Sequence, residues 1–332
     1  MAAVDAEQLA AQIRDGERRA LARAITLIES SRAADRPAAN RLLEQLVPHS
    51  GRSMRIGVSG VPGVGKSTFI ESLGNFLVDQ GHKVAVLAVD PSSAVSGGSI
   101  LGDKTRMELL SRRPEAFIRP SPAGETLGGV ARRTRETMLL AEAAGYDIVL
   151  IETVGVGQSE TTVSRMTDMF LLMLLPAGGD ELQGIKRGIV ELADLILVNK
   201  ADGDLKLAAE RSVADYRKAT AFLAPRQDGW RVPVEPYSAL QGSGLATVWE
   251  IVESFKAQRK ASGQFDRSRA AQSVNWMWAE INGRLIDRLK ADAQVSARIA
   301  ELEAEVRDNM ISPTTAADEL INIFVRRTEQ QD

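Results

Sequence analysis

The chain has 332 residues, of which 44% are hydrophobic and 26% charged, a balance that is typical of a soluble globular protein. The 41 basic and 44 acidic side chains leave a net charge of −3, which argues against a protein that coats nucleic acid or an anionic membrane. The absence of cysteine excludes disulfides, thiol nucleophiles and iron–sulfur ligation. With only two histidines, the sequence also offers little to bind a soft transition metal.

Three regions follow one another along the chain. Residues 1–53 carry apolar side chains at helical spacing and predict an N-terminal helical extension. Over residues 54–260, short apolar runs alternate with amphipathic segments, which indicates a mostly parallel sheet covered by helices on both faces. Residues 261–332 return to helices with narrow apolar stripes, which need a second surface to pack against. The strands expected in the middle region are residues 55–59, 83–90, 116–119, 146–152, 169–175, 195–199 and 232–237.

No apolar run reaches the length of a membrane-spanning helix, and the longest, residues 169–175, has the length of a buried strand. The first residues of the chain carry Asp5, Glu7, Asp15 and Glu17 and lack an apolar core, which is unlike a signal peptide. We therefore expect a cytoplasmic protein with neither a membrane nor a nucleic acid as its partner.

Residues 60–67 match the pattern G-x4-G-K-S between a predicted strand and a predicted helix, the context in which this motif forms a phosphate-binding loop. Its glycines allow backbone angles that turn successive N–H groups toward phosphates, and the N-terminus of the helix adds a positive dipole end. We expect Lys66 to reach the β- and γ-phosphates and Ser67 to offer its hydroxyl to Mg²⁺. The predicted triphosphate cradle comprises Gly60, Val61, Pro62, Gly63, Val64, Gly65, Lys66, Ser67 and Thr68.

Residues 199–202 read N-K-A-D at the end of a predicted strand and indicate which base is bound. The carboxylate of Asp202 would accept hydrogen bonds from the N1–H and 2-amino groups of guanine, a pair of donors that adenine lacks. Lys200 would lie along the base, and Asn199 would brace the loop. A backbone N–H after the last predicted strand would meet the guanine O6, in the tripeptide Ser238, Ala239 and Leu240. We therefore expect GTP or GDP as the bound nucleotide.

Acidic and amide side chains near the carboxyl ends of other strands are candidates for Mg²⁺ and water. Glu152 ends a buried strand and is suited to hold Mg²⁺ through water, and Gly155 would bring its N–H to the γ-phosphate. Asp90 is the other carboxylate at this edge of the sheet, where ligands of such folds bind. Asp103 is equally well interpreted as a solvated loop acid, and Gln158 either orients the attacking water or is a plain loop glutamine.

Two further groups of charged residues have competing interpretations. Asp180, Gln183 and Lys186 lie in a glycine-rich segment and would form a switch near the site, or a helix cap followed by a solvated lysine. The arginines that follow Gly129 are interpreted as a solvated helix face rather than as an arginine finger, and they are Arg132, Arg133 and Arg135. No residue of the sequence is therefore an obvious arginine finger, and intrinsic hydrolysis is expected to be slow.

In combination, four runs resemble the MeaB/ArgK family of P-loop GTPases associated with methylmalonyl-CoA mutase. They are residues 57–68, 88–93, 152–160 and 199–202. The resemblance covers the whole α/β region and implies a three-layer αβα P-loop fold flanked by all-helical extensions. It implies a homodimer held by the C-terminal helices, and GTP hydrolysis coupled to protection of the mutase and to gating of its adenosylcobalamin loading.

The same resemblance implies roles for individual residues. By that similarity, phosphate and Mg²⁺ are served by Lys66, Ser67, Asp90, Asp103 and Glu152. A switch that faces the partner enzyme would contain Asp180, Gln183 and Lys186. Within the resemblance, the metal ligands would be Ser67, Asp90 and Glu152.

Other function classes stay open as alternatives. A P-loop kinase or transport ATPase would use ATP and would need an acceptor pocket, and Asp202 argues against it. A nucleic-acid or ribosome-associated GTPase is disfavoured by the net charge of −3 and the lack of a dense basic run. Delivery of a soft metal such as nickel is disfavoured by the lack of cysteine.

Overall fold

The computed structural model of the chain describes residues 5–30, 32–89, 107–120, 127–153, 159–176, 187–222 and 228–328. Contacts within the chain divide it into two compact units, Met1–Gln272 and Ser273–Asp332, and the boundary falls inside a helix, α13 (Gln264–Ala291). This single boundary does not coincide with the limits expected from the sequence at residues 53 and 260. The three-region organisation therefore stays a prediction.

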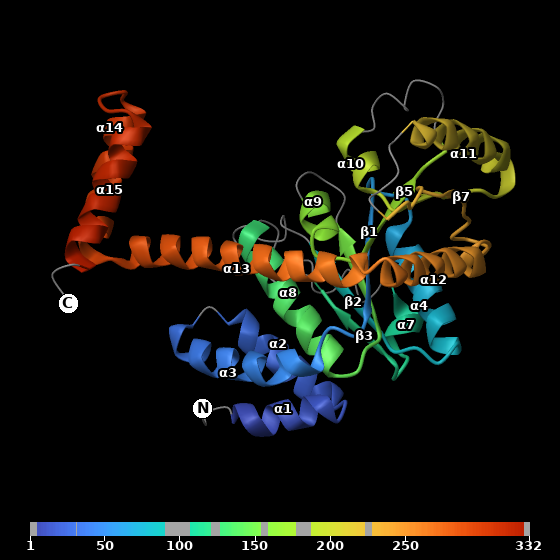
Figure 1. The fold of residues 1–332 in the computed structure, drawn as a ribbon, viewed down its shortest axis with the longest axis horizontal. Helices are drawn as coiled ribbons and strands as arrows, with labels where there is room; N and C mark the ends of the chain where they lie inside the picture. The colour runs from blue at the N-terminus through green and yellow to red at the C-terminus, as the bar shows by residue number, and fades with distance from the viewer. Residues whose placement is uncertain are drawn as a thin grey trace. The chain divides into compact units, whose positions relative to one another are not determined.

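The first unit is built on a seven-stranded sheet in the order β3-β2-β4-β1-β5-β6-β7 (Figure 1). Every neighbouring pair of strands runs parallel. The strands are β1 (Met54–Gly60), β2 (Val84–Val89), β3 (Ala116–Arg119), β4 (Ile148–Thr153), β5 (Met169–Leu174), β6 (Leu195–Val198) and β7 (Val234–Pro236). The strands expected from the sequence are all present, with ends that differ by a residue or two. The predicted α/β class is therefore confirmed.

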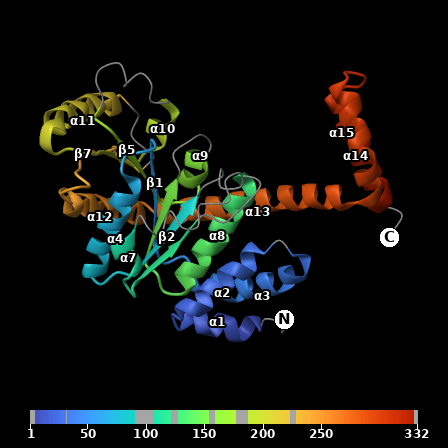
Figure 2. The ribbon, with the colours of Figure 1, turned by 180° about the vertical axis from the view of Figure 1, so that it is seen from behind.

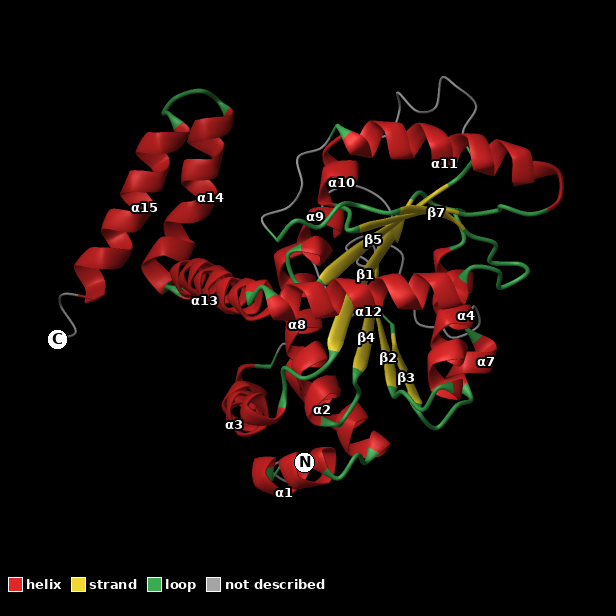
Figure 3. Cartoon of the chain, turned by 45° about the vertical axis from the view of Figure 1, so that its right-hand side comes forward, coloured by secondary structure: helices red, strands yellow, loops and turns green. Residues whose placement is uncertain are grey.

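Helices cover both faces of this sheet, because successive strand residues point to opposite faces and both sets are apolar. On one face, α4 (Lys66–Asp79) and α12 (Leu245–Ala261) bury their apolar side chains against β1, β4 and β5. Figure 3 shows α12 in front of the strands. On the other face, α11 (Lys206–Ala221) packs against β5 and β6 through Val213 and Tyr216.

The second face also carries α8 (Leu127–Ala143) and α9 (Ser159–Ser164), which contact each other and β4. The short helices of the unit are α7 (Glu108–Ser111), α10 (Arg187–Leu192), η1 (Ala33–Asp35), η2 (Val47–His49) and η4 (Gly203–Leu205). The N-terminal extension consists of α1 (Ala6–Arg14), α2 (Arg18–Glu29) and α3 (Arg36–Leu46), which pack on one another and on α8 (Figure 2). α1 begins where the Asp5 carboxylate accepts hydrogen bonds from two backbone N–H groups of its first turn.

The second unit holds the remainder of α13 together with α14 (Ala293–Arg307) and α15 (Pro313–Thr328). α14 and α15 pack against each other, and Arg298 joins them through an ion pair with Glu319. Large apolar side chains of this unit remain exposed, among them Trp278 at 57% and Met310 at 76%. None of the helices in the described ranges has the length and hydropathy needed to cross a membrane.

Candidate functional site

The phosphate-binding motif lies between the central strand β1 and the helix α4, which begins at Lys66. Gly60 has φ +154° and sits beside β5, where an added Cβ would come within 2.4 Å of the Met173 carbonyl oxygen. Gly65 has φ +98°, and a Cβ there would lie 2.5 Å from the Asn199 Nδ2. Real Cβ atoms do not approach other atoms so closely, so both positions need glycine.

The side chain of Lys66 lies inside the turn of this loop and is only 7% exposed. Its Nζ donates hydrogen bonds to the Gly60 carbonyl at 2.7 Å and to the Val61 carbonyl at 3.2 Å. The ammonium thus bridges the carbonyls at the start of the loop, and it brings a positive charge next to the N-terminus of α4. An anion is the natural ligand of such an arrangement.

β4 lies directly beside β1, with Glu152 in register with Val58. Because of this pairing, the Ser67 hydroxyl donates a hydrogen bond of 2.9 Å to the Glu152 Oε1. One residue further on, the Thr153 hydroxyl donates to the Ser59 hydroxyl at 3.0 Å, and both residues are almost fully buried. The ends of the two strands are therefore fastened to each other beside the loop.

The hydroxyl of Ser67 and the carboxylate of Glu152 are oxygen donors, the ligand type that Mg²⁺ prefers. Mg²⁺ in nucleotide sites takes only one or two protein ligands and completes its shell with phosphate and water. Within the described ranges, no group of three or more acidic or histidine side chains is arranged to hold a metal on its own. The pair therefore fits a Mg²⁺ that arrives with a nucleotide rather than a self-sufficient metal site.

The segments predicted to read the base lie side by side at the ends of β6 and β7. The Ser238 hydroxyl donates a hydrogen bond to the Asp202 Oδ2, and the backbone N–H of Ala201 donates to the Tyr237 carbonyl at 3.0 Å. Lys200 has φ +59°, a left-handed conformation that turns the chain sharply between Asn199 and Asp202. Ser238 is fully buried, whereas Asp202 is half-buried and accessible to a ligand.

Asn199 joins the base-reading segments to the phosphate loop. Its Nδ2 donates to the Val64 carbonyl at 2.6 Å, and its Oδ1 accepts from the Ala239 N–H at 3.0 Å. The side chain is 2% exposed, so water does not compete for these bonds. One amide thus fixes the distance between the two halves of the candidate site.

Several residues expected at the site lie outside the described residues. They are Asp90, Asp103, Gly155, Gln158, Asp180, Gln183 and Lys186. Val61, Pro62, Gly63 and Thr68 are exposed on the loop and on the first turn of α4. Leu240, the last residue of the tripeptide expected to meet the guanine O6, is 85% exposed. Arg132, Arg133 and Arg135 are half-buried on α8, so they do not form the fully solvated face expected from the sequence.

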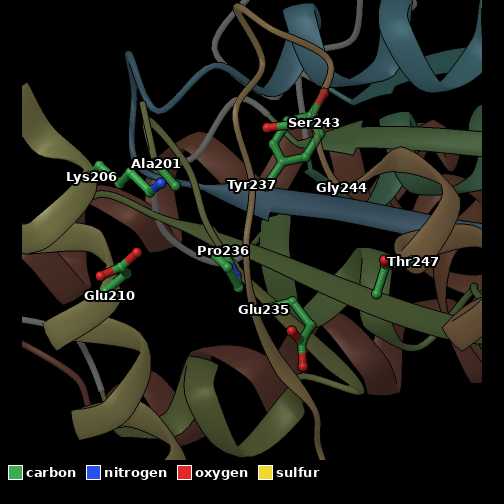
Figure 4. Close-up of a pocket in the computed structure, with 9 residues that line it drawn as sticks. All are labelled: Ala201, Lys206, Glu210, Glu235, Pro236, Tyr237, Ser243, Gly244 and Thr247. Atoms are coloured by element: carbon green, nitrogen blue, oxygen red, sulfur yellow. The ribbon is translucent and has the colours of Figure 1, made fainter. Parts of the chain in front are cut away.

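A cavity of about 290 Å³ lies next to the base-reading segments (Figure 4). It is lined by Ala201, Lys206, Glu210, Glu235, Pro236, Tyr237, Ser243, Gly244 and Thr247. The cavity contains neither Asp202 nor Asn199, so it is not the expected base site. Its wall includes Tyr237, whose ring packs edge-on against Phe69 at 5.1 Å and whose pKa burial raises to about 12. No local sequence pattern predicts this cavity, because its residues come from four separate segments.

Comparison with known proteins identifies the family. A family model described as methylmalonyl Co-A mutase-associated GTPase MeaB matches residues 21–294. The chain belongs to this family. A Caulobacter vibrioides protein named as a GTPase is 54% identical, over 97% of this chain and 98% of its own length. GTPase ArgK of Escherichia coli is 45% identical, over 93% of each chain.

The fold agrees with that membership. A crystal structure of an LAO/AO transport system kinase superposes with a TM-score of 0.76 at 38% identity, and the match covers 96% of this chain and 97% of that one. As a MeaB-family protein the chain is a P-loop GTPase, and the family takes its name from association with methylmalonyl-CoA mutase. The expected fold, a parallel sheet in a three-layer P-loop arrangement with helical extensions, is thus confirmed.

Proposed function

We propose that this MeaB-family GTPase is a chaperone that binds methylmalonyl-CoA mutase, protects it and gates the loading of its adenosylcobalamin cofactor. The nucleotide site rests on the Asn199 amide, which ties the phosphate loop to the segment beside Asp202, and the association with the mutase rests on the family membership. A site braced in this way recognises a guanine base and its phosphates as one rigid ligand, as a nucleotide-dependent switch requires.

The choice of guanine depends on Asp202. The Ser238 hydroxyl orients the carboxylate, which then accepts hydrogen bonds from the N1–H and 2-amino groups of guanine. Adenine has no such donors, so the carboxylate would gain no hydrogen bond from the base when adenine binds, at a cost of about 1–3 kcal/mol relative to guanine. Lys200 would lie along the base, and a backbone N–H among Ser238, Ala239 and Leu240 would meet the guanine O6.

The triphosphate would bind across residues 60–68, where the N–H groups of the loop and of the first turn of α4 face the anion. Lys66 would reach the β- and γ-phosphates, and Ser67 and Glu152 would hold Mg²⁺, the latter through water. When bound, Mg²⁺ would neutralise the negative charge that develops on the phosphates during hydrolysis. We propose the remaining residues of the site, Asp90, Asp103, Gly155, Gln158 and Lys186, from the family resemblance.

The C-terminal helices supply the proposed homodimer contact. Exposed Trp278, Leu285 and Met310, each at least half exposed, are more apolar than a solvated helix surface requires, and a second copy of the chain would cover them. We propose that the dimer works in the cytoplasm, with neither a nucleic acid nor a membrane as partner. The chain's net charge of −3 supports the proposal that neither a nucleic acid nor an anionic membrane is its partner.

Nucleotide competition tests the base assignment. A fluorescent GDP analogue is bound to the full chain and displaced with GTP, GDP or ATP. We expect displacement by the guanine nucleotides at micromolar concentrations or below, and none by ATP at a hundredfold excess. Equal displacement by ATP would favour the alternative of an ATP-using kinase or transport ATPase. Asp202→Asn should lose the preference for guanine nucleotides. Asp204→Asn is its matched control, because it removes the same charge from an exposed neighbour outside the site.

Co-purification tests the partner. The tagged chain is recovered from its native host in the presence of GDP or of a non-hydrolysable GTP analogue, and bound proteins are identified by mass spectrometry. We expect methylmalonyl-CoA mutase in amounts that differ between the two nucleotides. Loss of the mutase from both samples, with nucleotide binding intact, would overturn the chaperone role but would leave the GTPase assignment in place.

A further inference from the structure

A second network of long-range hydrogen bonds lies at the amino ends of the strands, away from the phosphate loop. Its centre is Arg269 on the first part of α13, whose guanidinium binds both oxygens of Asp168, at 2.8 Å to Oδ1 and 2.6 Å to Oδ2. The same group donates to the Ser53 carbonyl at 2.6 Å and to the Gly51 carbonyl. The side chains of the ion pair are only 12% and 3% exposed.

The network continues from Asp168 into the centre of the sheet. The Asp168 Oδ2 also accepts from the backbone N–H of Arg55 in β1 at 2.8 Å. The Arg55 guanidinium is buried in turn against Glu142 of α8, with two hydrogen bonds of 2.8 Å. Four charges are therefore paired away from water, and removing one partner would leave the other buried without a counter-charge. These buried bonds fix the start of α13 to the amino ends of β1 and β5.

The same part of α13 is bonded to the segment that follows α9. The Gln272 side-chain amide donates to the Thr167 carbonyl at 2.7 Å, and the Thr167 hydroxyl donates to the Val163 carbonyl in the last turn of α9 at 3.0 Å. Val163 and Thr167 are buried. Two residues, Thr167 and Asp168, thus connect α9 to α13.

α9 also contacts the strands of the candidate nucleotide site. It packs against β1 and β4, whose ends carry Gly60 and Glu152. The contact with β1 is made at Gly57, where an added Cβ would lie 2.7 Å from the Val163 Cγ1 and 3.1 Å from the Thr167 Oγ1. This close packing leaves α9 little room to move toward β1, and Thr167 lies in the same contact.

We propose that α9 is a relay that couples the nucleotide bound at the phosphate loop to the hydrogen bonds and the ion pair that fix the start of α13. The coupling would run through Thr167, Asp168, Gln272 and Arg269. The proposal rests on the proposed nucleotide site and adds to it a route from that site to the start of α13. Gln272 and Arg269 are positioning residues in this scheme. By linkage, if GTP and GDP differ in how strongly they stabilise the contacts of α13 with Thr167 and Asp168, then those contacts change the ratio of GTP to GDP affinity by the same factor.

Hydrogen exchange of the full chain tests the relay. Exchange of peptides that cover residues 264–272 is compared between the GDP-bound form and the form bound to a non-hydrolysable GTP analogue, with both affinities measured in the same samples. We expect rates that differ by at least about fivefold, the lower end of typical couplings between sites. Equal rates with both nucleotides bound would overturn the relay and leave the proposed function standing. Failure of either nucleotide to bind would overturn both.

Two variants separate coupling from plain stabilisation. In Gln272→Ala and in Thr167→Val, we expect the nucleotide-dependent difference to fall to less than half and the ratio of GTP to GDP affinity to change. Gln258→Ala is the matched control, because Gln258 makes the same kind of bond, from its amide to the Asp228 carbonyl at 2.9 Å, outside the relay. Equal weakening of both nucleotides in all three variants would mean that these bonds only stabilise the fold, which would refute the relay.

Discussion

Replacement of Asn199 by alanine probes the brace between the two halves of the site. The substitution removes the donor to Val64 and the acceptor from Ala239, and it leaves a void where Gly65 approaches the amide. The Val64 carbonyl would be buried without a partner, since Val64 is fully buried, whereas the half-buried Ala239 N–H would find water. The cost is that of one unsatisfied buried group, about 1–3 kcal/mol.

We expect this cost to appear as weaker nucleotide binding, because the site must be reassembled when a ligand binds. A loss of about 1–3 kcal/mol corresponds to roughly 5–150-fold in affinity. GDP and GTP should weaken alike, since the brace contacts neither the γ-phosphate nor the base-specific carboxylate. Isothermal titration calorimetry of the wild-type and variant chains with GDP measures the change directly.

A matched control and a second variant sharpen the test. Asn75→Ala removes a similar amide bond, to the Glu71 carbonyl at 2.9 Å, but inside α4, and it should leave GDP affinity unchanged. Asn199→Asp retains the acceptor for Ala239 but places a charged oxygen against the Val64 carbonyl, so it should weaken GDP binding at least as much as Asn199→Ala. GDP affinity of Asn199→Ala within twofold of the wild-type value, with the fold intact, would show that the brace does not organise the site.

Three further substitutions give separate readouts. Lys66→Ala should abolish hydrolysis with folding retained, measured by phosphate release and thermal melting, and unchanged turnover would remove the phosphate-loop assignment. Asp202→Asn should weaken GTP binding and favour xanthosine triphosphate, because the 2-oxo group of xanthine accepts the hydrogen bond that the new amide donates. An unaltered preference for guanine would contradict the base assignment. Burial raises the pKa of Glu142, but the hydrogen bonds and charge of Arg55 outweigh it and hold that pKa below its ordinary value of 4.5. The stabilisation is therefore present above pH 4.5 and lost as the pH falls further through the lowered pKa, so urea midpoints of the wild type should fall more steeply between about pH 5 and pH 3 than those of Glu142→Gln. Equal slopes would mean that folding does not lower the pKa of the Glu142 carboxyl.

The sequence alone determined the parts of this protein that depend on local pattern. Strands were predictable because buried parallel strands are continuous apolar runs, such as residues 169–175. The family was predictable because motifs such as residues 60–67 bind phosphate through consecutive backbone groups, which requires fixed spacing along one short segment.

Only the tertiary structure decided which distant residues meet. That β4 lies beside β1 brings Glu152 to Ser67, and that β6 and β7 are neighbours brings Ser238 to Asp202. The contact between Asn199 and Val64 joins residues that are 135 positions apart. No spacing along the chain encodes such pairs, because the order of strands is set by how helices and sheet pack together, a property of the whole core rather than of any one segment.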